Sequence, residues 1–400
     1  MKKRILVTII VLSTLFANAQ WQKTSGPKSG GRVRCLVANA SNLFAGTDTG
    51  GVFTSPNSGT NWGQVNTGMS PVYFLGPVLT ISGNNVFAGT RANGVYLSGN
   101  NGASWALVNT GLSNLYVSAI AVSGNNLFAG TSNGSGGVFL STNNGNNWIK
   151  IGTGMPKTFI DALAVIDSNL FTGSLPGGVY HSTYIGTSWT AWTEADTGLT
   201  NLNVAALAVN GNNLFAGTFG GGVFLSIDKS KTWTAINTGL SDKFVQTVVC
   251  IGSNLFAGTR YGGVFFSNNN GASWMAVNAG LTDLNVTSLL VNGNNLLAGT
   301  EGQGVFKVDI AQLTGFSEVQ ARSLQLTIYP NPSNGEFYVL DGKGEKQLLQ
   351  LFDGTGKLLL TQTLQSGKTV IDARNLAQGI YNVCLTTGEE RINKRLVIVK

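Results

Sequence analysis

Histidine, cysteine and charged side chains are scarce in this chain, and each shortage argues against a class of site. His181 is the only histidine among 400 residues, which disfavours His-based catalytic triads and multi-histidine metal sites. Cys35, Cys250 and Cys384 are too few for a disulfide framework and have no partner at metal-ligand spacing. We therefore predict three buried free thiols, no metal site and no cofactor.

Charged residues make up only 11% of the chain, and the formal charge of +7 is unevenly placed. Lys2, Lys3 and Arg4 supply +3, while residues 20–310 and 311–400 each carry a net charge of +2. No cluster of Lys and Arg follows, so the electrostatic footprint of nucleic-acid binding is missing. Nor does any later stretch reach the ~18 apolar residues of a membrane helix. We expect neither a nucleic-acid partner nor a membrane-spanning segment.

The N-terminus has the three parts of a signal peptide. Lys2–Arg4 are basic, Ile5–Phe16 are mostly apolar, and Ala17-Asn18-Ala19 provides a small-x-small cleavage site. The alternative is a buried first helix. We predict that residues 1–19 are a signal peptide and that the mature chain is exported.

Glycine, by contrast, is abundant at 54 residues, and an internal repeat accounts for it. The segment LFAGT or a close variant occurs seven times, about 42 residues apart, which is the length of a four-stranded propeller blade. GGVF or a relative follows each copy, and tight turns such as GNN favour antiparallel strands over a parallel solenoid. The second position of the copies is Phe44, Phe87, Phe128, Phe171, Phe215, Phe256 and Leu297.

A tryptophan ends six of the repeats, and the seventh has none. Trp21, however, lies 23 residues before Phe44, the same spacing that separates Trp105 from Phe128. We therefore predict that the segment around Trp21 supplies the missing fourth strand and leaves no open edge. The predicted fold class is all-β: a seven-bladed β-propeller over residues 20–310, closed by an N-terminal strand. The predicted blade tryptophans are Trp21, Trp62, Trp105, Trp148, Trp189, Trp233 and Trp274.

The turn before Trp62 reads Ser55-Pro56-Asn57-Ser58-Gly59-Thr60-Asn61-Trp62, and the turns before the later blade tryptophans follow its pattern. It resembles the Asp-box, or bacterial neuraminidase repeat, S-x-D-x-G-x-x-W, found in sialidases, xyloglucanase-like glycosidases, sortilin-type receptors and photosystem assembly-factor propellers. Asn usually replaces the Asp here; Asp228 keeps it in a copy where Ser230 replaces the Gly, and Tyr184 departs further. The resemblance implies a propeller in which the turn has a folding role and the Trp packs between blades.

The opposite face of such a disc carries the loop after LFAGT, whose first residue changes from blade to blade. These residues are Asp48, Arg91, Ser132, Leu175, Phe219, Arg260 and Glu301. The next loop adds aromatic residues: Tyr73, Phe74, Tyr116, Phe159 and Phe244. Variable side chains on a repeated scaffold suit a binding surface, with unselected loop variation as the alternative. The ligand-binding candidates are Arg91, Tyr116, Phe219, Arg260 and Tyr261.

The chain has little equipment for catalysis. The Arg-Ile-Pro motif of the sialidase family is absent, and a glycosidase needs two carboxyl groups at a set separation. Asp48 and Glu301, in equivalent loops of neighbouring blades, are the best such pair and weak catalytic candidates. Two alternatives to a binding module therefore stay open: a polysaccharide-acting hydrolase or lyase, and a structural surface protein.

The last ninety residues differ from the repeat. Residues 311–325 lack the pattern and indicate a linker, and residues 326–400 are predicted to form a small β-sandwich domain with Gly turns. The ordered motifs resemble the type A C-terminal sorting domain of the type IX secretion system of Bacteroidetes. The residues that carry the resemblance are Tyr329, Pro330, Asn331, Pro332 and Gly335, then Asp353, Gly356 and Lys357, then Gly379, Ile380, Tyr381 and Lys400.

This resemblance implies the secretion machinery as a partner and an address outside the cell. The domain would guide export across the outer membrane and then be cut off, leaving the rest secreted or attached to the cell surface. An ordinary β-sandwich that stays attached is the alternative. The function predicted from the sequence is thus a secreted or surface-displayed monomeric propeller that binds a glycan or a protein.

Overall fold

The computed structural model describes residues 20–27, 30–56, 58–70, 77–132, 136–156, 158–313, 327–341, 347–353, 357–364, 367–387 and 390–400. The predicted signal peptide, most of the predicted linker, Tyr73, Phe74 and Gly356 lie outside these residues. The chain divides into two compact units, Met1–Thr314 and Gly315–Lys400. Among the described residues, no helix has the length and apolar character needed to cross a membrane.

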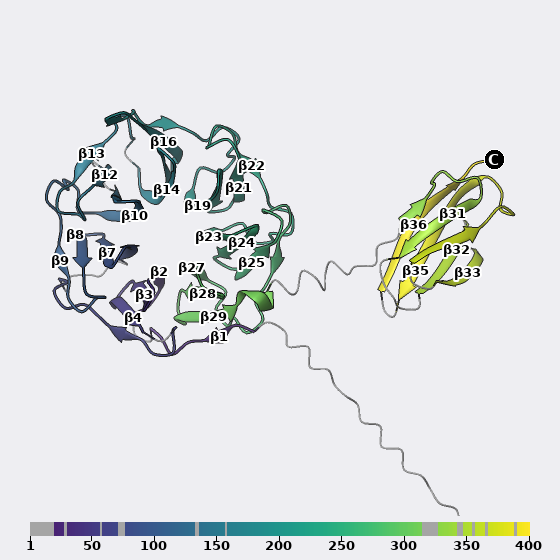
Figure 1. The fold of residues 1–400 in the computed structure, drawn as a ribbon, viewed down its shortest axis with the longest axis horizontal. Helices are drawn as coiled ribbons and strands as arrows, with labels where there is room; N and C mark the ends of the chain where they lie inside the picture. Colours follow the sequence, from purple (N-terminus) through teal and green to yellow (C-terminus); the bar gives the residue numbers. More distant parts are fainter. Residues whose placement is uncertain are drawn as a thin grey trace, which may run out of the picture. The chain divides into compact units, whose positions relative to one another are not determined.

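The first unit is a ring of small antiparallel sheets (Figure 1), seven of them in its described part. In each sheet the first strand lies nearest the centre of the ring and the last lies at the rim. Three sheets contain β2 (Val33–Ala38), β3 (Leu43–Thr47), β4 (Gly51–Ser55) and β5 (Gly63–Gln64); β6 (Val78–Ser82), β7 (Asn85–Thr90), β8 (Gly94–Ser98) and β9 (Ala106–Leu107); and β10 (Val117–Ser123), β11 (Asn126–Thr131), β12 (Gly137–Ser141) and β13 (Ile149–Ile151).

The next three sheets continue around the ring in chain order. They contain β14 (Ile160–Ile166), β15 (Asn169–Ser174), β16 (Gly178–Ile185), β17 (Ser188–Trp189) and β18 (Thr193–Glu194); β19 (Val204–Asn210), β20 (Asn213–Thr218), β21 (Gly222–Ser226) and β22 (Thr234–Ala235); and β23 (Val245–Ile251), β24 (Asn254–Thr259), β25 (Val264–Ser267) and β26 (Met275–Ala276).

The remaining sheet of the ring joins the two ends of this unit. It consists of β27 (Val286–Asn292), β28 (Asn295–Thr300), β29 (Val305–Asp309) and the N-terminal β1 (Gln22–Lys23). In this sheet β1 runs antiparallel to β29, with Gln22 opposite Lys307. The chain after β29 is helical over residues 310–313, and Leu313 is buried, so the segment that the sequence assigns to a linker begins with ordered structure.

Each LFAGT strand is buried along its length because it packs against the neighbouring sheet. The glycine of this motif has a steric role: a Cβ on Gly130 would lie 2.6 Å from Cγ2 of Ile160, which belongs to the first strand of the next sheet. Phe44, Phe87, Phe128, Phe171, Phe215 and Phe256 are at most 1% exposed and fill the layers between sheets. The repeat therefore encodes close contact between sheets as well as strand formation.

Tryptophans connect neighbouring sheets through one recurrent contact. In six places the indole Nε1 donates to a backbone carbonyl of the preceding sheet. The acceptor residue is in the last strand of that sheet or directly after it. The pairs are Trp21 with Val277, Trp105 with Val65, Trp148 with Val108, Trp192 with Ile151, Trp233 with Ala195 and Trp274 with Ile236. Trp62 has no such acceptor, and its Nε1 has no hydrogen-bond partner among the described residues.

Trp189 does not occupy the blade position predicted for it, and Trp192 takes that place. β16 extends to Ile185 and turns back at once, so Trp189 pairs with Tyr184 at the end of the strand. Its ring contacts Phe128 edge-on at 5.6 Å between centroids. The longer hairpin shifts the bridging tryptophan three residues along the chain, and Trp192 keeps the spacing of 23 residues to Phe215.

The turns before the tryptophans, here called box turns, are built from short polar side chains. Ser98 Oγ accepts a hydrogen bond from the Gly102 amide at 2.8 Å, and Asn100 Oδ1 accepts one from the Ser104 amide at 2.9 Å. Asp228 makes the equivalent contact with the Thr232 amide at 2.9 Å. Asn and Asp therefore do the same work in this turn, because each presents an oxygen acceptor at the same place.

The second unit contains two antiparallel sheets in its described part. One has the order β30 (Thr327–Tyr329), β31 (Glu336–Asp341) and β34 (Gly367–Asp372). The other has the order β33 (Leu358–Leu364), β32 (Gln347–Phe352), β35 (Gly379–Thr387) and β36 (Glu390–Ile398). Phe337, Val339, Leu349, Leu351, Val383 and Leu396 are fully buried and form its core.

The residues of the predicted sorting motif stabilise turns in this unit. Asn331 Oδ1 accepts a hydrogen bond from the Val397 amide at 2.8 Å, while its Nδ2 donates to the Arg395 carbonyl at 2.7 Å. Gly335 has φ of 102°, where an L side chain is strained. The Tyr381 hydroxyl donates to the Ala377 carbonyl at 2.7 Å. Asn331, Gly335 and Tyr381 therefore have a structural role in this unit, because each of them stabilises a turn.

Candidate functional site

Strand direction assigns the loops of the ring to two faces. Because successive strands are antiparallel, the loops after β3, β7, β11, β15, β20, β24 and β28 share one face with the segments that enter the first strand of each sheet. We call this the loop face. The box turns and the hairpins between first and second strands occupy the opposite, box-turn face. All five predicted ligand-binding residues are on the loop face.

Three of these five residues form an aromatic–arginine cluster with Phe244. The Arg260 guanidinium lies over the rings of Phe219 and Tyr261, at 5.9 and 5.4 Å from their centroids. Phe244 packs edge-on against Phe219 at 6.1 Å and Tyr261 at 5.6 Å. Tyr261 is 61% exposed and Phe244 40% exposed. The cluster therefore presents ring faces and a cation to solvent.

The backbone holds this cluster in place. The Arg260 amide donates to the Phe244 carbonyl at 2.9 Å, which fixes two of the loops together. Asp242 Oδ2 accepts hydrogen bonds from the amides of Tyr261 and Gly262 at 2.7 and 2.8 Å. An exposed surface that is already ordered loses little conformational entropy when a ligand binds.

The other two predicted residues, Arg91 and Tyr116, form a separate pair. The Arg91 guanidinium lies over the Tyr116 ring at 5.8 Å from its centroid. Arg91 Nε is buried and has no hydrogen-bond partner among the described residues. The Tyr116 loop is held by Asn114, whose Oδ1 accepts from the Tyr116 amide at 2.9 Å.

The two weak catalytic candidates are both engaged in ion pairs. Asp48 binds Arg34 of β2 through Nε and through Nη2, the latter at 3.3 Å. Glu301 Oε2 lies 3.3 Å from Nε of Arg32, and Arg32 Nη2 donates to Gln246 Oε1 at 2.9 Å. Both carboxylates are therefore held by arginine side chains of this chain and are not left free to face a substrate.

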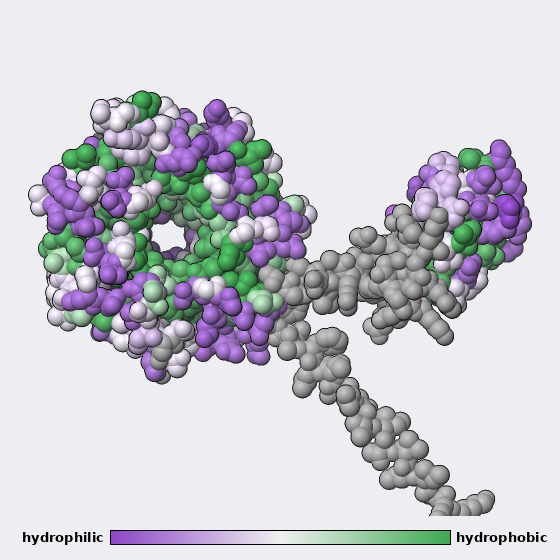
Figure 2. All heavy atoms as spheres, in the orientation of Figure 1, coloured by the Kyte–Doolittle hydropathy of each residue, from purple (hydrophilic) through white to green (hydrophobic). Residues whose placement is uncertain are grey.

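The centre of the ring is an open channel, and Figure 2 shows its opening. Its mouth on the loop face is a cavity of about 250 Å³ lined by the first strands of the sheets. Six of these strands have an irregular register, a β-bulge, one residue after they begin. The bulged residues are Arg34, Ser118, Asp161, Ala205, Gln246 and Thr287, and all six line the cavity.

Asp161 is the acidic residue of this lining, and the structure gives its carboxylate no hydrogen-bond or ion-pair partner among the described residues. Burial raises the pKa of Asp161 to about 6, against the opposing attraction of Arg91 and Arg34. Asp161 is not among the site residues predicted from the sequence. The available signal was a lone carboxylate in the apolar run FIDALAV, at a position occupied by small or neutral residues in most other repeats.

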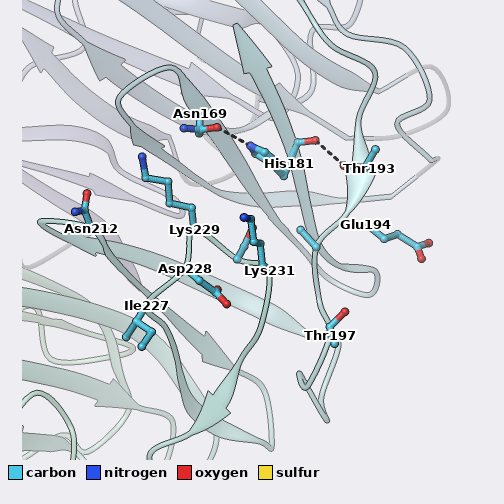
Figure 3. Close-up of a pocket in the computed structure, with 12 residues that line it drawn as sticks. Asn169, His181, Thr193, Glu194, Thr197, Asn212, Ile227, Asp228, Lys229 and Lys231 are labelled. Atoms are coloured by element: carbon cyan, nitrogen blue, oxygen red, sulfur yellow. Dashed lines mark hydrogen bonds between the residues drawn. The ribbon is translucent and has the colours of Figure 1, made fainter.

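A larger cavity, of about 510 Å³, is on the box-turn face and lies between the sheets that contain β16 and β21 (Figure 3). Lys229 and Lys231 extend toward Asn169 and His181, whereas the carboxylates of Glu194 and Asp228 point away. Lys229 Nζ pairs with Asp167 at 2.7 Å. His181 stacks on Phe171 at 4.9 Å, and burial lowers the pKa of its imidazole. Its neutral ring is thus part of the wall.

Nothing in the described residues gathers three or more His, Cys, Asp or Glu side chains around a common point where a metal ion fits. None of the three cysteines forms a disulfide within the described residues; Cys384 is buried, whereas Cys35 and Cys250 are half-buried. Cys35 Sγ donates to the Pro77 carbonyl at 3.0 Å, and burial raises the pKa of its thiol to about 12. Such a thiol is a poor nucleophile.

Comparison with known proteins separates the two units. Residues 327–399 match the family of the secretion system C-terminal sorting domain. A search of curated proteins finds no match to the chain.

Solved structures resemble the chain at low identity. PorZ of Porphyromonas gingivalis, an essential bacterial surface component of the type IX secretion system, is 16% identical with a TM-score of 0.55. The match covers 92% of this chain and 60% of that one. YCF48 from Cyanidioschyzon merolae is 15% identical with a TM-score of 0.58, over 73% of this chain and 99% of that one. A YCF48 bound to D1 peptide is 14% identical with a TM-score of 0.56, over 72% and 94% of the two chains.

At these identities the likeness shows the fold alone, and the fold of both neighbours is a β-propeller. The chain is therefore an all-β protein with a propeller-type ring of four- and five-stranded antiparallel sheets, followed by a region that matches the type IX sorting domain. This match supports export to the cell surface or beyond.

Proposed function

We propose that residues 20–310 form a seven-bladed propeller, closed by β1, that binds an extracellular protein or glycan on its loop face. Residues 326–400 direct its export through the type IX secretion system. The observation that carries the binding role is the aromatic–arginine cluster of Phe219, Phe244, Arg260 and Tyr261. Exposed, ordered aromatic rings beside a cation are the groups that dominate protein recognition and that stack on sugar rings.

Two further observations support binding over catalysis. Asp48 and Glu301 are each paired with an arginine, so the best carboxylate pair in the sequence is committed to structure. A YCF48 with the same type of fold is bound to a peptide. A peptide ligand therefore has a precedent on this type of fold. The peptide bound by that YCF48 does not identify the ligand of this chain or the residues that would bind it.

The test uses residues 20–400 on a glycan array and in pull-downs of purified extracellular proteins. The double substitution Arg260→Ala/Tyr261→Ala removes the cation and the most exposed ring, and we expect it to weaken binding by about tenfold or more. Ile227→Ala is the matched control, because Ile227 is 71% exposed and belongs to the box-turn face. A ligand bound equally by all three proteins would contradict the assignment of the loop face. The absence of any ligand would favour the structural alternative.

Export has its own test. In a bacterium that carries the type IX system, a chain truncated after residue 325 should stay in the periplasm, while the full chain reaches the medium or the cell surface. Surface appearance of the truncated chain would contradict the sorting role.

A further inference from the structure

The bulged residues of the channel mouth make one contact repeatedly. In three sheets the bulged side chain donates a hydrogen bond to the carbonyl just before the bulge of the next sheet. Ser118 donates to Ile160 at 2.7 Å, Gln246 to Val286 at 2.9 Å and Thr287 to Val33 at 2.5 Å. These donors join the first strands of neighbouring sheets around the channel.

The series is interrupted at Asp161. The equivalent acceptor is the Val204 carbonyl, and an ionised carboxylate has no hydrogen to donate to it. The next bulged residue, Ala205, has no polar group at all. No side chain among the described residues donates to the Val204 carbonyl. By the register of the three sheets that make this contact, the Asp161 carboxylate and the Val204 carbonyl are neighbouring oxygen acceptors at the channel mouth, in place of a donor and an acceptor.

The charges around Asp161 indicate which kind of group the two acceptors would bind. Arg34, the cation of the channel lining, is bound by Asp48, and Arg32 is bound by Glu301. Asp161 keeps a raised pKa even though Arg91 and Arg34 attract its negative charge, so burial is only partly compensated. A further positive charge placed directly beside the carboxylate would complete the compensation.

We propose that the channel mouth binds a primary ammonium group of the ligand, with Asp161 as its counter-ion and the Val204 carbonyl as a second acceptor. This rests on the proposed ligand binding at the loop face. A cavity of about 250 Å³ is smaller than the sites of drug-sized molecules, so it receives a single extended side chain such as lysine.

Binding should depend on pH through Asp161. The charged groups that act on it are Arg34 of β2 and Arg91 of the loop after β7. The strands packed beside it, β10, β15 and β19, contribute no titratable side chain. Protonation removes the counter-ion, and with a pKa of about 6 the affinity should fall by about tenfold between pH 7.5 and pH 5.

The experiment titrates residues 20–400 with Nα-acetyl-lysine amide and, separately, with Nα-acetyl-norleucine amide, which lacks the ammonium. NMR follows the side-chain carboxyl signal of Asp161. We expect only the lysine compound to bind and to lower the pKa of Asp161. Asp161→Asn should weaken its binding by about tenfold or more, because a charge-assisted hydrogen bond is lost. Asp167→Asn, on the box-turn face, should bind as the unchanged chain does.

Equal binding of the two compounds, or unchanged binding by Asp161→Asn, would overturn the ammonium site. So would displacement of the lysine compound by Ca²⁺ alone, since that result would identify a metal site. The two proposals fail separately. A ligand that needs Arg260 but ignores Asp161 would remove only the ammonium site, and lysine binding without any larger ligand would remove only the proposed function.

Discussion

The indole Nε1 of Trp21 donates a hydrogen bond of 2.6 Å to the carbonyl of Val277, which is 256 residues further along the chain. The Trp21 amide also donates to the Ala279 carbonyl at 2.7 Å, and the side chain is 2% exposed. These contacts attach the start of the ring to the segment between β26 and β27.

Replacing this tryptophan should destabilise the whole ring. Trp21→Ala removes a buried aromatic side chain and one hydrogen bond, and we expect a loss of about 3–5 kcal/mol in the free energy of unfolding. Urea unfolding followed by circular dichroism measures it. A change below about 1 kcal/mol would mean that β1 contributes little to closure.

Trp192 and Trp189 offer a matched comparison, because they are three residues apart in the same sheet. Trp192 bridges to Ile151 and is 5% exposed, whereas Trp189 is half-buried and its Nε1 has no partner among the described residues. We expect Trp192→Ala to cost about 3–5 kcal/mol in unfolding free energy and Trp189→Ala clearly less. A larger loss of unfolding free energy for Trp189→Ala than for Trp192→Ala would indicate that Trp189 is the bridging tryptophan.

The motif glycines should tolerate no side chain. In Gly130→Ala the new Cβ would lie 2.6 Å from Ile160 Cγ2, so the neighbouring strand must move, at a cost of about 1–3 kcal/mol in unfolding free energy. Gly63→Ala is the control, because a Cβ there meets nothing within 4 Å. Equal melting temperatures for the two variants would show that the sheets are not packed as closely as described.

Asp161 should reduce stability at neutral pH. Its pKa is about 6 in the folded chain and near the ordinary value of 3.8 when unfolded, so the folded state binds more protons between these values. Stability is therefore lost as pH rises through this window. Asp161→Asn cannot ionise and can donate to the Val204 carbonyl, so its melting temperature should exceed that of the unchanged chain at pH 7.5. The difference should shrink by pH 4, and calorimetry at both pH values measures it.

The repeat made the ring predictable, because strands, turns and the position of Trp21 recur at a fixed spacing. The placement of Trp189 failed because the box pattern was followed where the distance of 23 residues to Phe215 pointed to Trp192. Phe219, Arg260 and Tyr261 lie together in the structure, as expected from their places in the loops after the LFAGT strands. Their role as a binding surface stays a prediction.

Other parts of the site depended on geometry that the sequence does not express. Asp161 faces the channel because of a β-bulge, which a simple alternation of strand residues does not reveal. Likewise, Asp48 and Glu301 are carboxylates in variable loops, and only the folded chain shows that Arg34 and Arg32 neutralise them.

The short strand β1 begins at Gln22, three residues after the predicted cleavage point, and Trp21 comes before it. Only Gln20 therefore separates the predicted cleavage point from Trp21, the residue that attaches β1 to the ring. Removal of the predicted signal peptide after residue 19 would leave Trp21 in place, whereas a cut two residues later would delete it. The position of the predicted cleavage point and the completion of the ring are therefore linked, because this sheet combines β1 with β27, β28 and β29 from the other end of the unit.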